Sequence, residues 1–334
     1  MQRISFEKVY DEFHRVLLKA GFPPERATLC ARVFAENMRD GVYSHGLIRF
    51  PDFVEKACQG EHFDMRAQLE KVGSFGSLEQ WDGHLGPGMV NATFCMDRAI
   101  DLARQHSLGC VALKNNNHWM RAGTYALQAA EVGCIGLCWT NTIRLMPPWG
   151  SAEKRLGNNP LAVGVPREEG HVLLDMAMTQ FSGGKTFIYR RNKEMFPVPG
   201  GYDGEGVLTQ DPDAVQASGR PLPIGYWKGS GLAFVLDMVA ALLAGGRSTA
   251  QFTRQGGEYG VSQVFIAIDI EKVAGAEDLR ETVEDIVGDL HQALPLEEGG
   301  EVTYPGERML KTRRENLEKG IPVDDEFWQR VLDM

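Results

Sequence analysis

The feature that most constrains the fold is an alternation of helical and strand-like apolar patterns along the middle of the chain. A helix is predicted around 89–104, and a second helix near 121–131. Strands are predicted before, between and after these helices, at "GCVALK", "GCIGLCWTN", "NPLAVGVP", "HVLLDMAM" and "SQVFIAIDI". Helices that alternate with strands pack against the faces of a sheet, so the pattern predicts an α/β fold with a mixed sheet.

Both ends of the chain have helical patterns instead. The first 60 residues predict three helices, and the last segment, "DDEFWQRVLDM", predicts another. We therefore expect three parts: an N-terminal helical region at 1–70, an α/β body at 71–306, and C-terminal helices at 307–334 that pack with the first region. Residues 183–226 are rich in Gly, Pro and charge, which predicts a long loop region over a site.

Composition excludes several classes of protein. The 334 residues are 43% hydrophobic and 24% charged, which is typical of a globular protein and not of a disordered one. The net charge of -10 is spread along the chain, so no nucleic-acid footprint or membrane-surface patch is indicated. We expect small molecules or copies of the chain itself as partners.

The sequence also predicts a cytoplasmic protein. Its N-terminus has no signal-like apolar run, and "GLAFVLDMVAALLAGG" is interrupted by Asp237 and is too short to span a bilayer. Six cysteines lie mostly in apolar segments. Cys134 and Cys138 would lie about 13 Å apart on one strand, from a rise of roughly 3.3 Å per residue, which is too far for a disulfide. Buried, reduced thiols are expected.

The segment "GVYSHGLIRF" contains the first candidate site. Ser44 could cap a helix that carries His45 in its first turn and Arg49 one turn later on the same face. A helix N-terminus lowers the pKa of a histidine, and an arginine fork matches a carboxylate. This arrangement would suit a proton donor beside an acid-binding group. The alternative is an ordinary surface helix start.

Familiar nucleotide and metal motifs are absent from the sequence. "FSGGKTF" has Thr179 where a P-loop requires its first glycine, and "GSGLAF" has Phe234 where the dinucleotide fingerprint requires its third. There is no HExxH and no CxxC, so no metal site is expected. A nicotinamide cofactor would have to bind without a Rossmann loop.

Three further segments are candidate binding loops. "KNNNHWMRAG" places His118 at a strand-to-helix junction, after asparagines that could cap the helix and reach polar substrate groups. "GYWKGSG" places Lys228 in a turn that could hold a phosphate, with Trp227 available to lie against a flat ring. In "YPGERM", Glu307 could bind ribose hydroxyls and Arg308 a phosphate. Each segment also has an interpretation without function. His118 could be a core or capping histidine, "GYWKGSG" a flexible turn, and "YPGERM" a turn before a helix.

Taken together, these stretches resemble one family along nearly the whole chain, the malate/L-lactate dehydrogenase family of the second type. The matching segments are "GVYSHGLIRF", "NNHWMRAGTY", "GLCWTN", "MPPWG", "NNPLAVGVP", "LLDMAM", "GYWKGSGLAFVLDM", "EYGVSQVFIAID" and "YPGER". Within it the chain is most similar to a branch that reduces a 2,3-diketo sugar acid. Other members use malate, lactate or ureidoglycolate, and a catalytically silent sugar-acid binding protein is the alternative from another class.

The resemblance implies a non-Rossmann oxidoreductase and a homodimer with its active site near the interface. It implies NADH as cofactor, with NADPH possible, a 2-oxo acid substrate, and His45 as proton donor. Chemistry assigns Arg49 to the substrate carboxylate, Ser44 and His118 to the carbonyl, and Asp175 to the catalytic group. The cofactor positions implied are His171, Val172, Leu173, Leu174, Asp175, Met176, Ala177, Trp227, Lys228, Gly306, Glu307 and Arg308.

Overall fold

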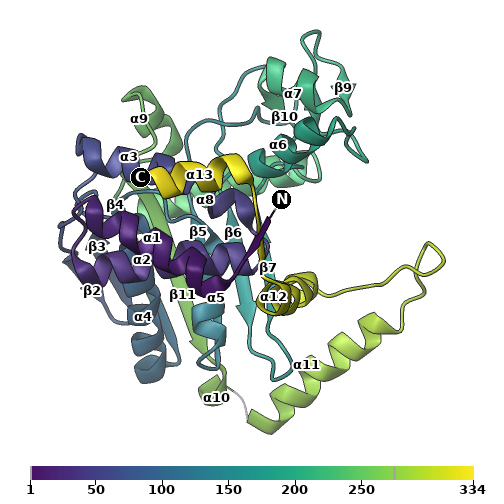
Figure 1. Cartoon of the computed structure of the whole chain (residues 1–334). Coiled ribbons are helices and arrows are strands. Elements are labelled where there is room, and N and C mark those ends of the chain that lie inside the picture. The colour runs from purple at the N-terminus through teal and green to yellow at the C-terminus, as the bar shows by residue number, and fades with distance from the viewer. Residues whose placement is uncertain (1, 274–275) are drawn as a thin grey trace.

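The computed structural model describes residues 2–273 and 276–334, and it is built around one twisted sheet (Figure 1). The strands lie in the order β2-β3-β4-β11-β5-β6-β7. Only β3 and β4 are parallel neighbours; the other neighbours in this sheet are antiparallel, which confirms the predicted mixed α/β fold. The strands are β2 (Glu70–Phe75), β3 (Leu78–Asp82), β4 (Leu108–Asn116), β11 (Val261–Asp269), β5 (Cys134–Thr140), β6 (Leu161–Val165) and β7 (Val172–Met176).

Helices cover both faces of the central strands, which explains why those strands read as nearly continuous apolar runs. On one face α4 (Gly88–His106) and α5 (Ala122–Ala130) pack on side chains such as Phe265. On the other face α8 (Trp227–Ala244) packs on side chains such as Val264. Strand β5 carries Gly136 because an added Cβ would lie 2.6 Å from the Cβ of Ala129 on α5. The close approach of α5 therefore requires a glycine there.

The two chain ends lie together beside this sheet. Helices α1 (Phe6–Lys19), α2 (Pro24–Arg39) and α3 (Phe50–Gln59) share a core in which the rings of Phe13 and Phe50 stack at 4.2 Å. Strand β1 (Gln2–Ile4) pairs with β12 (Ile321–Val323), while α12 (Glu307–Lys319) contacts α2 and α13 (Asp325–Asp333) contacts α1. The exact boundaries at residues 70 and 307 stay a prediction.

The prediction of a long loop over 183–226 was wrong. This segment forms a small lobe at one end of the molecule (Figure 1). Side-chain caps from Ser182 and Asp211 start its helices, and the rings of Phe181 and Phe196 stack at 4.2 Å in its core. Its short elements are α6 (Gly183–Asn192), β8 (Gly201–Tyr202), β9 (Leu208–Thr209), α7 (Pro212–Ser218) and β10 (Arg220–Pro221). Such brief elements lack the periodicity that identifies longer ones.

The remaining elements connect these parts. Helix α11 (Ala276–His291) extends away from the body (Figure 1), and an ion pair at 2.8 Å between Arg167 and Glu284 ties it to the β6–β7 connection. The other short elements are η1 (Tyr43–His45), α9 (Thr249–Arg254) and α10 (Ile270–Val273).

The statement that the apolar segment is too short to span a bilayer was wrong for helix α8. At 18 residues it is longer than expected, and it is the one helix in the described residues long and apolar enough to cross a bilayer. Its main chain is nevertheless bound to the sheet, because Trp139 donates to Leu236 O at 3.1 Å. Asp237 accepts hydrogen bonds from Asn141 and from Thr249 N, both at 2.8 Å. One face of α8 therefore belongs to the core.

All six cysteines are free, as predicted. Burial raises the pKa of the Cys30 thiol to about 12 and that of Cys110 to about 11, so both stay protonated at neutral pH. Cys58 is the exception to the expected burial, because it lies exposed in the last turn of α3.

Candidate active site

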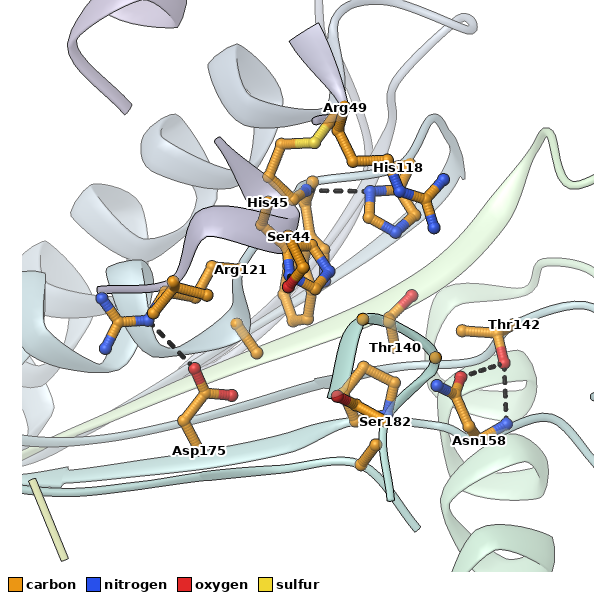
Figure 2. A pocket seen from close by; sticks show the side chains of 18 of the residues that line it. Ser44, His45, Arg49, His118, Arg121, Thr140, Thr142, Asn158, Asp175 and Ser182 are labelled. Carbon is orange, nitrogen blue, oxygen red and sulfur yellow. Dashed lines mark hydrogen bonds and ion pairs between the residues drawn. The ribbon is translucent and has the colours of Figure 1, made fainter. Parts of the chain in front are cut away.

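A cavity of about 660 Å³ lies where the N-terminal helices, the sheet and the small lobe meet. Its walls come from η1 and α3, the β4–α5 connection, the end of β5, strand β7, and the first residues of α6. Figure 2 shows Ser44, His45 and His118 projecting into the same space. The cavity thus brings together residues from distant parts of the sequence.

The local structure around His45 differs from the predicted helix start. Residues Tyr43–His45 form a single 3₁₀ turn, and α3 begins only at Phe50, with Arg49 as its N-cap. Gly46 ends this turn with φ −114° and ψ −120°, outside the helical region, and packs directly on Met38 of α2, where a Cβ would not fit. His45 and Arg49 therefore share a cavity, but they are not one turn apart on one helix.

His45 is held in place by its neighbours. Its main-chain oxygen accepts from Asn37 Nδ2 at 2.9 Å, and its Nδ1 lies 3.2 Å from the hydroxyl of Ser44. Burial, followed by the positive charge of Arg49, lowers the pKa of His45 to about 4, although the carboxylate of Asp175 opposes this shift. The imidazole is therefore neutral at pH 7 when the cavity holds no ligand.

His118 lies opposite, with its ring nearly parallel to that of His45 at 5.9 Å between centroids. Its Nδ1 accepts from the main-chain N–H of Met120 at 3.0 Å, so the neutral ring carries its proton on Nε2. Burial and the nearby charge of His45 lower its pKa well below the ordinary value. His118 can therefore donate a hydrogen bond from Nε2.

The asparagines before His118 do not cap α5 as predicted, but Asn117 lines the cavity, so contact of an asparagine with the substrate stays a prediction. Asn116 donates to Gln263 Oε1 at 2.7 Å, and Asn117 donates to Leu85 O at 2.7 Å. Neither caps α5, whose N-cap is Arg121, a residue without a side-chain capping bond. The asparagines instead hold the end of β4 in place.

Behind His45, charged side chains form a chain from the partly exposed Asp175 to the buried Arg121 and Asp40, and the sequence did not predict these pairings. Arg121 donates through Nε to Asp175 at 3.1 Å and through Nη1 to Asp40 at 3.0 Å. Arg313 of α12 makes two further bonds to Asp40, at 2.7 and 2.8 Å. Burial raises the pKa of Asp40, but the bonds from Arg313 and Arg39 outweigh it, so the net pKa is lowered. The only signal for Arg121 was its place in "NHWMRAG".

The opposite wall is polar and carries both signs of charge. Arg49 and Lys56 come from the α3 region, and Glu258 comes from the connection before β11. No acid forms an ion pair with Arg49 among the residues that the structure describes. Thr142 and Asn158 are joined by a hydrogen bond of 2.9 Å on this side of the cavity (Figure 2).

The predicted cofactor residues fall into two groups. Strand β7 and the start of α12 are adjacent, because Leu173 N donates to Pro305 O at 2.8 Å. Leu173, Asp175, Ala177 and Gly306 line the cavity. Neighbouring positions do not line it: His171, Val172, Leu174, Met176, Glu307 and Arg308.

Some of those side chains already have partners. Glu307 accepts from His291 at 3.0 Å, and Arg308 donates to Thr303 Oγ1 at 3.3 Å. Trp227 and Lys228 occupy the first turn of α8, exposed and outside the cavity lining. The structure therefore does not bring these two together with His45.

The start of α6 forms another part of the wall. Ser182, its N-cap, lines the cavity, and Gly184 packs directly on Ser44, at a distance that leaves no room for a Cβ. This contact places the small lobe against the turn that carries His45. Within residues 2–273 and 276–334, no cluster of three or more His, Cys, Asp or Glu side chains could hold a metal ion.

The arrangement suits reduction or oxidation at a carbon next to a carboxylate. An unpaired arginine can hold the acid, and two histidines within the same space can bind and protonate an oxygen. Strand β7 is at the edge of the sheet, where Leu173 N is bonded to Pro305 O and the side chains of Leu173, Asp175 and Ala177 line the cavity.

Comparison with known sequences agrees with this chemistry. Residues 4–332 match the model of the malate/L-lactate dehydrogenase family. The chain is 44% identical to a 2,3-diketo-L-gulonate reductase of Citrobacter koseri and 43% identical to one of Klebsiella pneumoniae. Each match extends over 330 residues, which is 98% of this chain and 99% of the relative.

Solved structures with the same architecture include two dehydrogenases. The malate dehydrogenase of Entamoeba histolytica superposes with a TM-score of 0.93 at 23% identity, over 99% of this chain and 96% of that one. The sulfolactate dehydrogenase of Methanocaldococcus jannaschii has a TM-score of 0.89 at 29% identity, with the same coverage.

Proposed function

This chain belongs to the malate/L-lactate dehydrogenase family and is an oxidoreductase that acts on CH–OH groups, and from that premise we propose that it reduces the C2 carbonyl of a 2-oxo sugar acid. The proposed reaction converts 2,3-diketo-L-gulonate to 3-keto-L-gulonate with NADH. The names of the relatives at 43–44% identity support this substrate. The observation that carries the proposal is the meeting of His45, His118 and the unpaired Arg49 in one cavity.

The residues present fit a nicotinamide cofactor. Gly306 lines the cavity with a φ of +99° and packs directly on β7, since a Cβ there would lie 2.9 Å from Leu173 N. Asp175 and Ala177 continue this wall toward the histidines. Bound there, a reduced nicotinamide would supply the hydride that adds to C2 of the substrate.

The side chains of this protein would hold the substrate and supply the proton. Arg49 would bind the carboxylate through its fork, and Nε2–H of His118 would bind the carbonyl oxygen. As hydride adds to C2, the carbonyl electron pair moves onto oxygen, which takes a proton from His45. Ser44 would orient the His45 ring through Nδ1. The Asp175 carboxylate, which Arg121 holds in place, would provide a negative charge near the imidazolium.

The test is a spectrophotometric panel of 2-oxo acids with NADH and NADPH, run with and without chelator. We expect oxidation of NADH with 2,3-diketo-L-gulonate and no loss of rate in chelator. Higher efficiency with oxaloacetate or pyruvate would instead favour a malate- or lactate-type dehydrogenase. Tight binding of the sugar acid without any change in absorbance at 340 nm would favour a silent binding protein.

We also propose a cytoplasmic homodimer with neither a membrane nor a nucleic-acid partner. The support is the outer face of α8, where apolar side chains are exposed without a partner in the described residues: Leu232, Phe234, Val235, Met238 and Leu242. Because a contiguous apolar face of this kind marks a contact surface, a second copy of the chain is the proposed occupant. A position of the active site near the interface is part of this proposal; Trp227 and Lys228, which lie outside the cavity of their own chain, begin the same helix.

A further inference from the structure

Glu258 is an acidic side chain in the cavity that the proposed reaction does not use. It lies between α9 and β11, on the wall that also holds Thr142, whereas His45 comes from η1. A 2-oxo acid requires a cationic clamp for its carboxylate, a role that a glutamate cannot fill, and a proton donor, a role that the proposed reaction gives to His45. Its position in the cavity therefore calls for another explanation.

The carboxylate is held in place but keeps bonding capacity. Its Oε2 accepts from the main-chain N–H of Ile143 at 3.3 Å, and the next residue, Tyr259, stacks on His62 with ring centroids 3.7 Å apart. Oε1 accepts no hydrogen bond from the described part of the chain. The Ile143 N–H holds Oε2, and the stacked ring of Tyr259 holds the adjacent main chain. Oε1 can therefore meet a ligand at little cost in conformational entropy.

Two opposing effects act on the protonation of Glu258. Burial raises its pKa above the ordinary value, and this effect is larger than the opposing effects of the Ile143 N–H and of the positive charges of Arg49 and Lys56. No ion pair joins Glu258 to either cation within the described residues. The carboxylate thus remains available to a ligand that Arg49 has bound.

We propose that Glu258 determines specificity for the tail of the substrate, accepting hydrogen bonds from hydroxyl groups and repelling a second carboxylate. This inference rests on the proposed function, because it assumes that Arg49 holds the C1 carboxylate. With C1 on Arg49 and C2 at the histidines, the rest of the molecule extends along the wall formed by Glu258 and the Thr142–Asn158 pair. A polyhydroxylated chain satisfies these groups, whereas a methyl group leaves them without partners.

The experiment measures binding rather than turnover, so that its result is independent of whether the protein reduces any acid. Isothermal titration gives the affinities of L-gulonate, L-lactate and L-malate for the full-length protein and for Glu258→Ala and Glu258→Gln. Glu153→Gln is the matched control, since Glu153 is 68% exposed, pairs with Arg155 and lies outside the cavity lining. Circular dichroism of each variant reports folding.

We expect wild-type protein and the control to bind L-gulonate more tightly than L-lactate. In Glu258→Ala this preference should fall about ten- to hundredfold, the range for losing hydrogen bonds to a charged group. Glu258→Gln keeps the volume and loses the charge, so L-malate should bind several-fold more tightly to it than to wild type. An unchanged gulonate preference in Glu258→Ala, or its absence in wild type, would overturn the inference.

The two proposals fail separately. If the titrations behave as expected while no 2-oxo acid is reduced, the role of Glu258 stands and the proposed reaction falls. If 2,3-diketo-L-gulonate is reduced but the gulonate preference does not depend on Glu258, the reaction stands and the role of Glu258 is wrong.

Discussion

At the scale of single residues, the protonation of His45 depends on what fills the cavity. Burial and the charge of Arg49 hold its pKa at about 4, so a ligand-free protein at pH 7 has almost no imidazolium there. A substrate carboxylate bound to Arg49 would cancel part of that positive charge. The pKa of His45 should then rise, and substrate binding would itself create the proton donor.

The first prediction is that binding of a carboxylate ligand takes up a proton. The groups facing His45 are Arg49, Arg121, Asp175 and His118, and of these Arg49 is the one expected to be neutralised by the ligand. Titration of oxamate at pH 5–6 in buffers of different ionisation enthalpy should reveal this uptake. Above the raised pKa of the ligand-bound protein, His45 is neutral both with and without ligand, so the proton uptake should vanish as pH increases. His45→Gln should abolish it, and equal heats in all buffers for wild type would contradict the argument.

The second prediction concerns turnover. A positioned acid contributes about a hundredfold to ten-thousandfold to the rate, so His45→Ala should lower kcat by that factor while NADH binding stays nearly unchanged. His45→Gln preserves the bulk but has no titratable proton, and it should be almost as slow. Steady-state kinetics from pH 5 to 9 checks both variants. Near-normal turnover would transfer the acid role to His118.

At the scale of elements, the site depends on how α6 meets η1. Gly184 lies against Ser44, the neighbour of His45, and a side chain at position 184 would collide with it. Gly183 precedes it in the same helix, and an added Cβ there meets nothing within 4 Å. Both glycines line the cavity, but only Gly184 lies against the turn that carries His45.

The third prediction follows from this contrast. Gly184→Ala should push α6 away from Ser44 and lower kcat/KM by about tenfold or more, since misplacing a positioned group by about 1 Å can cost a hundredfold. Gly183→Ala adds the same methyl group to the same helix and serves as the control. Kinetics on both variants, together with their melting temperatures, separates a local shift from general destabilisation. Equal effects of the two substitutions would show that the Ser44 contact is unimportant.

The fourth prediction tests the outer face of α8. Leu242 is 72% exposed on this face, and a charge there should oppose burial against a second copy. Leu242→Glu should therefore convert a dimer to a monomer, as measured by light scattering after gel filtration. Leu18→Glu places the same charge at a 42% exposed position on α1, and it should leave the dimer intact. A wild-type protein that is monomeric at micromolar concentration would refute the proposed interface.

At the scale of the whole molecule, the charges behind the site link the end of the chain to its beginning. Arg313 on α12 and Asp40 after α2 are separated by 273 residues, and Asp40 also accepts from Arg121, which binds Asp175. The cavity wall from β7 and the N-terminal turn with His45 are thereby joined through one buried network. Folding of the C-terminal helices should therefore support the geometry of the active site.

The fifth prediction is that Arg313→Ala destabilises the protein by about 2 kcal/mol, because the buried Asp40 loses two charge-assisted hydrogen bonds and keeps those from Arg121 and Arg39. Lys319→Ala on the same helix is the control: Lys319 is 59% exposed, with Glu315 at 3.7 Å as its ion-pair partner, so little change is expected. Urea unfolding measures both. A loss no larger in Arg313→Ala than in Lys319→Ala would show that the network contributes little.

The sequence by itself determined the elements that are long and regular. The alternation of helices and strands predicted β4, α5 and β5 close to where they lie, because burial of one face or of both leaves a periodic trace of apolar residues. The motif around Ser44 and His45 also indicated a site. The predicted helix at His45 was wrong, because these residues form a 3₁₀ turn. Gly46, which follows the turn, packs on Met38 of α2, a tertiary contact that the local sequence does not encode.

Only the tertiary structure decided which distant side chains share the cavity. Arg121, Glu258 and Gly184 carry no local pattern that separates them from ordinary surface or turn residues, and they meet His45 because the strand order and the lobe bring them there. The elements of the lobe at 183–226 are likewise too short to be recognised by periodicity. Local sequence encodes local burial, whereas the site is built from helices, strands and loops that are far apart in the sequence. The charges behind it depend on a contact between residues 273 positions apart.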